Sequence, residues 1–464
     1  MRRLYLALFL FYPFFAFSQK PSENESIIQE GLILLNYIQE DLYENHILLA
    51  QKDSLQEAFQ EAFRQINSRD STVNTKELFI ILSKVFTSIQ DGHTTIFDLN
   101  YNSFDGLLFP YDILVYENKL FIKENFNCSQ LKKGDEIISI NNTPTSKFLE
   151  EMSKLTFYED ERVIPKIVQK RFPYFLWLLS KENCPAFDIQ YKPYGKDEIL
   201  NIIISQPLDQ TLINKSTKDH IIHKLNNSAE LYRISSNTVC LKIMNFNDTE
   251  KSFKKFMQQC THYLNHHTNY ENIIIDIRGN PGGGINNAFT VLKYFIPNNQ
   301  SLELSIRHYS GPLLNMSFKK INIVRKMKAY LSRAKYKPMN GRKQFTTHLY
   351  RFKGVKEKVL IEGNIFLLTN EETFSSAGIF ADYFKAYNIG ITYGKHHVNY
   401  KLTGGTFYQT FKNLNFRYYI PSLKFIYPEK LRLCEPPDQI IDCSLEEQIF
   451  KADCIMDKIL EIIE

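Results

Sequence analysis

The feature that most constrains the fold is an apolar run followed by a glycine cluster at residues 272–284. Four isoleucines precede a turn that holds three consecutive glycines, Gly282, Gly283 and Gly284. An apolar run bounded by turn residues is typical of a strand buried in the middle of a sheet. Because glycine allows the backbone to approach a ligand closely, the turn is suited to presenting N–H groups. It lacks the Lys-Ser/Thr ending of a phosphate-binding loop.

A second strand, turn and helix are predicted at residues 365–384. An apolar run at 365–368 reads as a buried strand, and apolar residues at helical spacing follow the turn. This arrangement puts Ser375 and Ser376 at the start of the helix, where unpaired N–H groups favour a developing negative charge. Ser375 is therefore either a nucleophile or a simple helix cap, which is a common role for serine.

Together the two stretches resemble the family of C-terminal processing proteases and tricorn core proteases. In that family an Asp-x-Arg-x-Asn-x-Gly-Gly strand and loop precede a serine in Phe-Ser-x-Ala at a helix start. Here the first motif supplies Asp276, Arg278 and Asn280, and the second supplies Ser375. The resemblance runs from about residue 71 to the C terminus. It implies an α/β fold with a crotonase/ClpP-like layered catalytic core, and hydrolysis of peptide bonds through an acyl-enzyme on Ser375.

The resemblance also assigns roles to the residues around the serine. The oxyanion is expected between the backbone N–H groups of Ser376 and the glycine loop, with Gly282 or Gly283 as the second donor. We expect the glycine loop to be held in shape by Asp276, Arg278 and Asn280.

The general base is expected to be His93, because tricorn-type members carry their base in a similar Asp/Ser-Gly-His context and this chain reads Asp91-Gly92-His93. The third catalytic residue is expected upstream of a Pro-Asp pair, which makes Glu435 the first choice and Glu429 the second. The alternative base is a lysine, as in the processing proteases. Lys395 and Lys401 flank the expected position, but a neutral lysine requires burial, whereas histidine titrates near neutral pH.

Two other classes of function stay open. One is a catalytically inactive relative that binds peptides or hydrophobic ligands, since the fold also serves as a retinoid carrier in the family. Gly378 favours this reading because many relatives have glutamate there. The other is a serine esterase.

Three regions are predicted after a leader. Residues 19–100 read as a helical cap, with one apolar stripe from Ile28 to Ile38 and another from Leu78 to Ile89. Residues 104–207 form a β-rich module that resembles a PDZ domain in its Gly-Asp-x-Ile segment around Gly134; residues 106–109 faintly match the PDZ carboxylate-binding loop. Residues 231–464 alternate strands and helices, which predicts the α/β catalytic domain. Residues 310–353 are expected to form a flap over the site.

Residues 1–18 have the pattern of a cleaved secretory signal. Arg2 and Arg3 precede an apolar stretch, and the sequence up to Ser18 fits a small-x-small cleavage site. The apolar stretch contains Pro13 and is shorter than the ~20 residues of a spanning helix. We therefore expect an exported protein, periplasmic or secreted, with no stable membrane span after cleavage.

Composition excludes some partners. The net charge of +5 over 464 residues, with no basic run interleaved with aromatics, argues against nucleic-acid binding. The expected partner is a peptide or protein substrate, with no cofactor and no metal. His262 and His266 have the i, i+4 spacing of metal ligands on a helix, but no acidic or thiol partner lies at a helpful spacing. We therefore expect them to lie on a surface helix rather than in a metal site. One disulfide is possible among Cys434, Cys443 and Cys454, although small buried thiols fit equally well.

Overall fold

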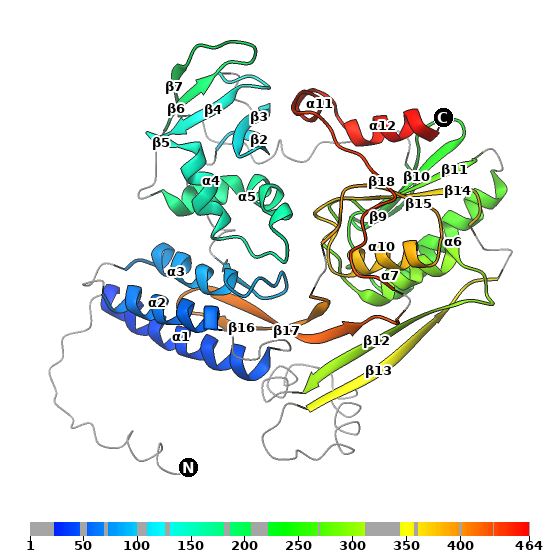
Figure 1. Ribbon diagram of the computed structural model, residues 1–464, viewed down its shortest axis with the longest axis horizontal. Coiled ribbons are helices and arrows are strands. Elements are labelled where there is room, and N and C mark those ends of the chain that lie inside the picture. The colour runs from blue at the N-terminus through cyan, green and yellow to red at the C-terminus, as the bar shows by residue number, and fades with distance from the viewer. Residues whose placement is uncertain are drawn as a thin grey trace.

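The computed structural model describes residues 23–46, 53–68, 73–99, 109–125, 130–180, 186–205, 221–267, 270–310, 344–356, 361–398, 401–429 and 431–463. The predicted leader, residues 311–343 of the predicted flap, the segment at 106–108, Cys128, Cys184 and residues 206–220 lie outside these residues. Residues 344–353 of the predicted flap form a strand. Figure 1 shows three parts: a helical region, a β-rich module above it, and a layered core beside both. The predicted α/β class is confirmed. No helix of the described residues is long and apolar enough to cross a membrane.

The core is built on a seven-stranded sheet with the order β18-β15-β14-β11-β10-β9-β8. Strands β10, β11, β14, β15 and β18 are parallel, and β8 and β9 are antiparallel additions. The bounds of the strands are β8 Ile221–Leu225, β9 Ala229–Arg233, β10 Thr238–Ile243, β11 Asn272–Asp276, β14 Asn364–Thr369, β15 Ile391–Gly394 and β18 Gln439–Ile440.

Helices cover both faces of this sheet. On one face lie α6 Glu250–His266, α7 Ile285–Leu292 with the 3-10 turn η4 Lys293–Phe295, and α10 Ser376–Ala386; on the other lies α12 Cys454–Ile463. Ile273 and Ile275 pack toward the first group, and Ile274 packs toward α12. Both faces of β11 are therefore buried, which explains why its sequence is apolar without alternation.

The glycine loop and the serine loop lie at one edge of this sheet. The glycine loop follows β11, and the serine loop follows β14, the neighbouring parallel strand, with Asp276 paired to Leu368. Because parallel strands end at the same edge, ligands of such sheets bind beyond their carboxyl ends. The two loops predicted to form the site therefore lie side by side.

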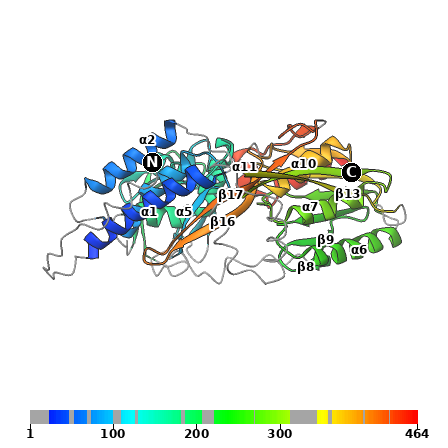
Figure 2. The same cartoon turned by 90° about the horizontal axis from the view of Figure 1, so that it is seen from below.

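The helical region carries α1 Glu23–Asn45, α2 Asp53–Asn67 and α3 Thr75–Thr87. These helices pack against a five-stranded antiparallel sheet with the order β1-β17-β12-β13, in which β16 also pairs with β17. The strands are β1 Thr95–Asp98, β12 Ser301–Ser310, β13 Gln344–Lys353, β16 Thr403–Phe411 and β17 Phe416–Ile426. Figure 2 shows β16 and β17 extending from the helices toward the core. This sheet brings residues from both ends of the chain to one place.

The β-rich module is a six-stranded antiparallel sheet with helices. Its elements are β2 Tyr111–Tyr116, β3 Lys119–Asn125, β4 Glu136–Ile140, β5 Thr143–Pro144, α4 Thr145–Ser153, η2 Glu161–Val163, α5 Ile164–Leu179, β6 Phe187–Lys192 and β7 Leu200–Ile204. Gly134 forms the turn before β4 with φ +94°, a backbone angle that favours glycine. Peptide binding by this module remains a prediction.

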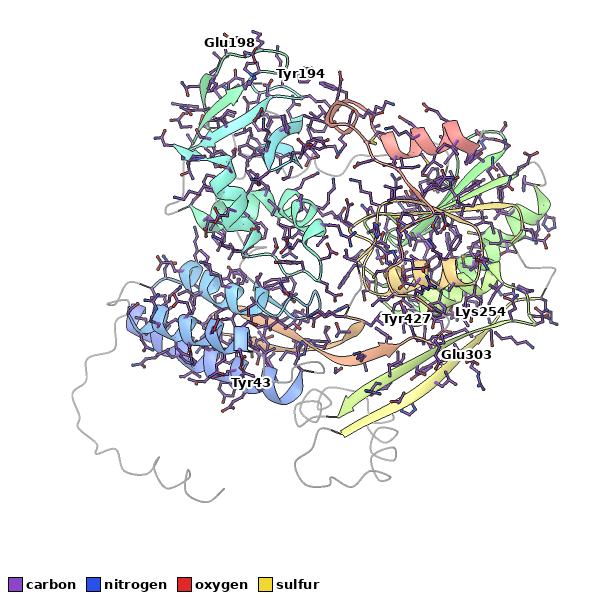
Figure 3. All side chains as sticks on the ribbon, in the orientation of Figure 1. Tyr43, Tyr194, Glu198, Lys254, Glu303 and Tyr427 are labelled. Carbon is purple, nitrogen blue, oxygen red and sulfur yellow. A yellow bond between two sulfur atoms is a disulfide. The ribbon has the colours of Figure 1, made fainter. Side chains whose placement is uncertain are left out.

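A short C-terminal helix, α11 Leu445–Phe450, joins the module to the core. Ile449 packs on Leu114 and Phe121 of the module, and the ring of Phe450 lies 5.0 Å from that of Tyr194. Figure 3 labels Tyr194 at this contact. The disulfide between Cys443 and Cys454 closes the segment that carries α11. One of the possible C-terminal bridges is thus present, while Cys434 keeps its thiol.

Candidate active site

Ser375 occupies a strained turn between β14 and α10. Its backbone angles are φ 56° and ψ −125°, a sparsely populated region for a residue with a Cβ atom. Serine nucleophiles at strand-to-helix turns adopt such a conformation, which exposes Oγ. The side chain makes no capping hydrogen bond with α10. Of the two roles predicted for Ser375, helix capping is therefore not the one it has in this structure.

The structure brings His93 to Ser375. Nε2 of His93 lies 3.0 Å from Oγ of Ser375, although 282 positions separate the two residues. The imidazole lies against the ring of Phe374, with centroids 4.7 Å apart. A Cβ atom on Gly92 would lie 2.7 Å from Cζ of Phe374, so glycine permits this close packing. The two side chains expected to form the catalytic pair are in hydrogen-bonding contact.

The other ring nitrogen of His93 contacts a threonine that the sequence analysis missed. Nδ1 lies 3.0 Å from Oγ1 of Thr403, and that hydroxyl donates to Oδ1 of Asp91 over 2.9 Å. A hydroxyl has one hydrogen, and a carboxylate can only accept. Thr403 must therefore accept from Nδ1–H of His93, which leaves Nε2 with the lone pair that a general base needs.

Asp91 anchors this chain of hydrogen bonds from a buried position. Its carboxylate also accepts from Oγ1 of Thr94 over 2.6 Å and from Nε2 of His46 over 3.0 Å. Burial raises the pKa of Asp91, but the hydrogen bond and charge of His46 and the charge of His93 outweigh burial and lower that pKa well below its ordinary value. Asp91 is thus a fixed negative charge behind the His93–Thr403 pair.

A second carboxylate, that of Glu159, lies close to His93. Its Oε1 is 3.8 Å from Nδ1 of His93, and the side chain is fully buried. Oε2 accepts the backbone N–H of Lys401 over 2.9 Å, while Oε1 has no hydrogen-bond partner. Glu159 therefore adds negative charge where an imidazolium would form.

The glutamates predicted to orient His93 lie elsewhere. Glu435 lines a cavity beside α10 together with Asp382 and His397, and its Oε1 accepts from Arg432 over 3.3 Å. Glu429 is exposed. The structure does not bring Glu435 to the catalytic pair, because the segment after β17 runs along the side of α10 rather than toward its first turn.

The glycine loop packs directly on the nucleophile. A Cβ atom on Gly282 would lie 2.7 Å from Cβ of Ser375, so no other side chain fits there. The N–H of Gly282 already donates to Oδ1 of Asn280 over 2.8 Å. The bridge between Phe246 and this loop uses the carbonyl of Gly282 and the N–H of Gly284. The N–H of Gly283 therefore points away from Phe246.

The N–H of Ser376 is the other predicted oxyanion donor. Ser376 is the first residue of α10, so its N–H has no acceptor within the helix. Of the three predicted donors, Gly282 already donates to Asn280 and packs on Ser375, so Ser376 and Gly283 remain the candidates for the role.

Ion pairs hold the glycine loop at its base. The guanidinium of Arg278 donates to both carboxylate oxygens of Asp276 over 2.9 Å and to those of Asp453 over 2.8 and 2.7 Å. Burial opposes the charge on Asp276, yet Arg278 lowers the pKa of that carboxyl. Nδ2 of Asn280 donates to the carbonyl of Ile243 over 2.9 Å. The supporting positions predicted for Asp276, Arg278 and Asn280 match these contacts, and Asp453, the residue just before α12, is an addition.

Lys395 does not have the properties of a general base. Its Nζ lies 2.8 Å from Asp442 and 3.4 Å from Glu371. Burial lowers the pKa of Lys395, but these carboxylates outweigh burial and raise that pKa above its ordinary value. A lysine base needs a lowered pKa. Lys395 therefore lacks the environment that a lysine base requires.

A cavity of about 510 Å³ opens beside His93. Its apolar lining includes Phe97, Phe157, Ile167 and Phe374. Lys170, which lies 2.5 Å from Glu372, contributes charge to the same lining. The cavity offers an apolar side chain a place next to the imidazole.

Comparisons with known proteins identify a family match for part of the chain and a shared fold. Residues 237–422 match the model of peptidase family S41. Mature CPAF complexed with lactacystin has a TM-score of 0.66 at 11% identity, over 94% of this chain and 98% of that chain. A mutant of CPAF has a TM-score of 0.66 at 12% identity, over 94% and 96%. No match was found among curated protein sequences. At these identities the solved structures show a shared fold.

Proposed function

From the match of residues 237–422 to peptidase family S41, we propose that this chain is an exported serine peptidase that forms an acyl-enzyme on Ser375. The observation that carries the proposal is the chain of contacts from Ser375 through His93 and Thr403 to Asp91. It fixes the tautomer in which His93 can remove the serine proton.

In the proposed reaction, Oγ of Ser375 attacks the carbonyl carbon of a peptide bond while Nε2 of His93 takes the hydroxyl proton. The imidazolium is stabilised by the charges of Asp91 and Glu159. The N–H groups of Ser376 and Gly283 stabilise the oxyanion, and one such donor contributes about 3–4 kcal/mol. His93 then protonates the leaving amine. In the second step His93 takes a proton from the water that attacks the acyl-enzyme, and it returns that proton to Oγ of Ser375.

Export is the part of the proposal that rests on sequence. The charged and apolar start of residues 1–18 supports cleavage near Ser18. The mass of the mature N terminus tests this directly: an intact Met1 on protein recovered outside the cytoplasm would rule out cleavage.

The two other functional classes make different predictions for one experiment. The purified protein is incubated with a fluorophosphonate, with casein and with a short-chain ester, alongside Ser375→Ala as the control. Labelling together with casein cleavage, both lost in the variant, is the result expected of a peptidase. Ester turnover without proteolysis supports an esterase, and no labelling supports an inactive binding protein. Because CPAF was solved in complex with lactacystin, lactacystin is a second probe for the same site.

A further inference from the structure

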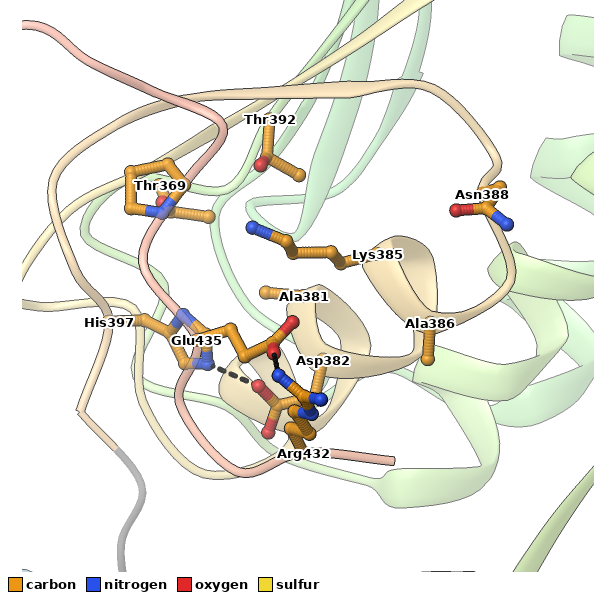
Figure 4. Close-up of a pocket in the computed structure, with 11 residues that line it drawn as sticks. Thr369, Ala381, Asp382, Lys385, Ala386, Asn388, Thr392, His397, Arg432 and Glu435 are labelled. Atoms are coloured by element: carbon orange, nitrogen blue, oxygen red, sulfur yellow. Dashed lines mark hydrogen bonds and ion pairs between the residues drawn. The ribbon is translucent and has the colours of Figure 1, made fainter. Parts of the chain in front are cut away.

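Three side chains of different chemistry meet beside α10, away from the Ser375–His93 pair. Asp382 lies on α10, His397 follows β15, and Cys434 follows β17. All three are at least nine-tenths buried. Nε2 of His397 lies 2.8 Å from Oδ1 of Asp382, and the ligand atoms of the three side chains all lie within 4.8 Å of one another. Figure 4 shows His397 pointing at Asp382. These residues are called the Asp382–His397–Cys434 cluster.

We propose that this cluster binds a zinc ion. Imidazole nitrogen, carboxylate oxygen and thiolate sulfur are the three ligand types of protein zinc sites. Zinc bonds of about 2.0–2.3 Å in a tetrahedron place ligand atoms roughly 3.3–3.6 Å apart. The 2.8 Å between His397 and Asp382 and the 4.8 Å limit for all three ligand atoms lie on either side of that range, so zinc binding requires the side chains to shift within the cluster. The mixture of nitrogen, oxygen and sulfur favours zinc over magnesium or calcium, which take oxygen ligands.

Surrounding groups hold Asp382 in a ligating orientation. The hydroxyl of Tyr427 donates to Oδ2 of Asp382 over 2.6 Å, and the backbone N–H of Cys434 donates to Oδ1 over 3.1 Å. Metal-binding carboxylates are characteristically held by such outer hydrogen bonds.

A cavity of about 290 Å³ supplies room for a fourth ligand. It is lined by Asp382, His397 and Glu435, and Figure 4 shows the Glu435 carboxylate beside Arg432 at the same end of the cavity. Three protein ligands with one open position leave a place for water. Glu435, which resemblance had placed in catalysis, thus lies next to the proposed metal.

The metal would join two segments, those of His397 and Cys434, to the serine helix that carries Asp382. His397 precedes Val398, which forms a bridge with Phe374 next to Ser375. Cys434 has φ 49°, an uncommon backbone angle for a residue other than glycine. A bound ion would account both for the position of His397 and for the backbone conformation of Cys434. The inference stands whether or not Ser375 is catalytic.

The competing explanation is a cluster held by hydrogen bonds alone. In that case the full-length protein, after chelation and dialysis, takes up no stoichiometric metal. The test adds Co²⁺ and Zn²⁺ in turn, with metal analysis after dialysis. Zinc binding predicts one ion per chain and, with Co²⁺, a near-ultraviolet charge-transfer band from a thiolate–cobalt bond. Absence of both in the wild-type protein would overturn the proposal without any variant.

Matched variants assign the ligands. Cys434→Ser is expected to abolish the charge-transfer band, whereas Cys260→Ser keeps it, because burial raises the pKa of the Cys260 thiol and keeps it protonated on α6. Tyr427→Phe retains the thiol and is expected to weaken binding roughly 10–100-fold. Circular dichroism checks that each variant is folded. A band that survives in Cys434→Ser and is lost in Cys260→Ser would place the metal elsewhere.

Discussion

Oγ1 of Thr403 donates a hydrogen bond to Oδ1 of Asp91 over 2.9 Å, across 312 positions of sequence. Since the same hydroxyl accepts from Nδ1 of His93, Thr403 sets the tautomer of the proposed base. Thr403→Val removes this acceptor and keeps the shape. We expect kcat/KM to fall by about 5–150-fold, the equivalent of the ~1–3 kcal/mol of an unsatisfied buried donor.

Thr403→Ser is the matched control because it restores the hydroxyl. We expect it to recover most of the activity on a peptide substrate, with KM unchanged in both variants. If valine and serine variants were equally active, the threonine would have no role in orienting His93.

Strain at Ser375 predicts a difference between two inactive variants. Ser375→Ala and Ser375→Gly both lose Oγ, but only glycine relaxes the backbone at φ 56°. Relief of about 1–3 kcal/mol exceeds the ~0.4–1 kcal/mol by which glycine stabilises the unfolded chain. The glycine variant should therefore have the higher free energy of unfolding in urea. An alanine variant of equal or greater stability would show that the turn is unstrained.

The lowered pKa of Asp91 predicts acid sensitivity. A carboxyl group with a lower pKa in the folded state stabilises the protein above its unfolded pKa of about 3.9, and this contribution is lost as pH falls toward the folded pKa. Asp91→Asn should thus be less stable than wild type at pH 7, and the difference should shrink below about pH 4. Urea unfolding at several pH values measures both. A difference that grew on acidification would contradict the lowered pKa.

Arg278 is expected to matter for stability through its buried partner. Arg278→Met leaves Asp276 buried with only Lys242 near it, at 3.6 Å. Removing one partner of a buried ion pair costs about 3–5 kcal/mol. Arg351→Met breaks an exposed ion pair, since the side chain of Arg351 is 67% exposed and that of its partner Glu303 is 39% exposed. This variant should lose at most about 1 kcal/mol of unfolding free energy. Equal losses in the two variants would mean that the ion pairs of Arg278 do not secure the loop.

Local sequence patterns were sufficient for the strands and helices that carry the site. The apolar run of β11 and the helical spacing of α10 are local patterns. Once β11 and β14 are taken as neighbouring parallel strands, the loops at their carboxyl ends must lie side by side. His93 followed from the resemblance of the Asp91-Gly92-His93 motif to tricorn-type members, because its contacts with Ser375 and Thr403 are far away in sequence.

Thr403 and Glu159 carry no such local signal. Thr403 reaches His93 because β16 pairs with β17, and β17 pairs with β1, which follows His93. The apolar residues at alternate positions 416, 418 and 420, which are buried on β17, were the available sign of this sheet. The pairing itself is non-local. Glu435 was misleading because its position upstream of a Pro-Asp pair does not determine the path of the segment after β17.

The identity of the nucleophile and base is tested most directly by the rate of fluorophosphonate labelling, with the adduct located by peptide mapping. The account predicts a single adduct on Ser375, no adduct in Ser375→Ala, and unchanged labelling in Ser376→Ala and Lys395→Ala. Labelling of His93→Ala should be slower by about 10²–10⁴-fold, the usual contribution of a general base. An adduct on Ser376, or wild-type labelling in His93→Ala together with its loss in Lys395→Ala, would contradict the Ser375–His93 assignment.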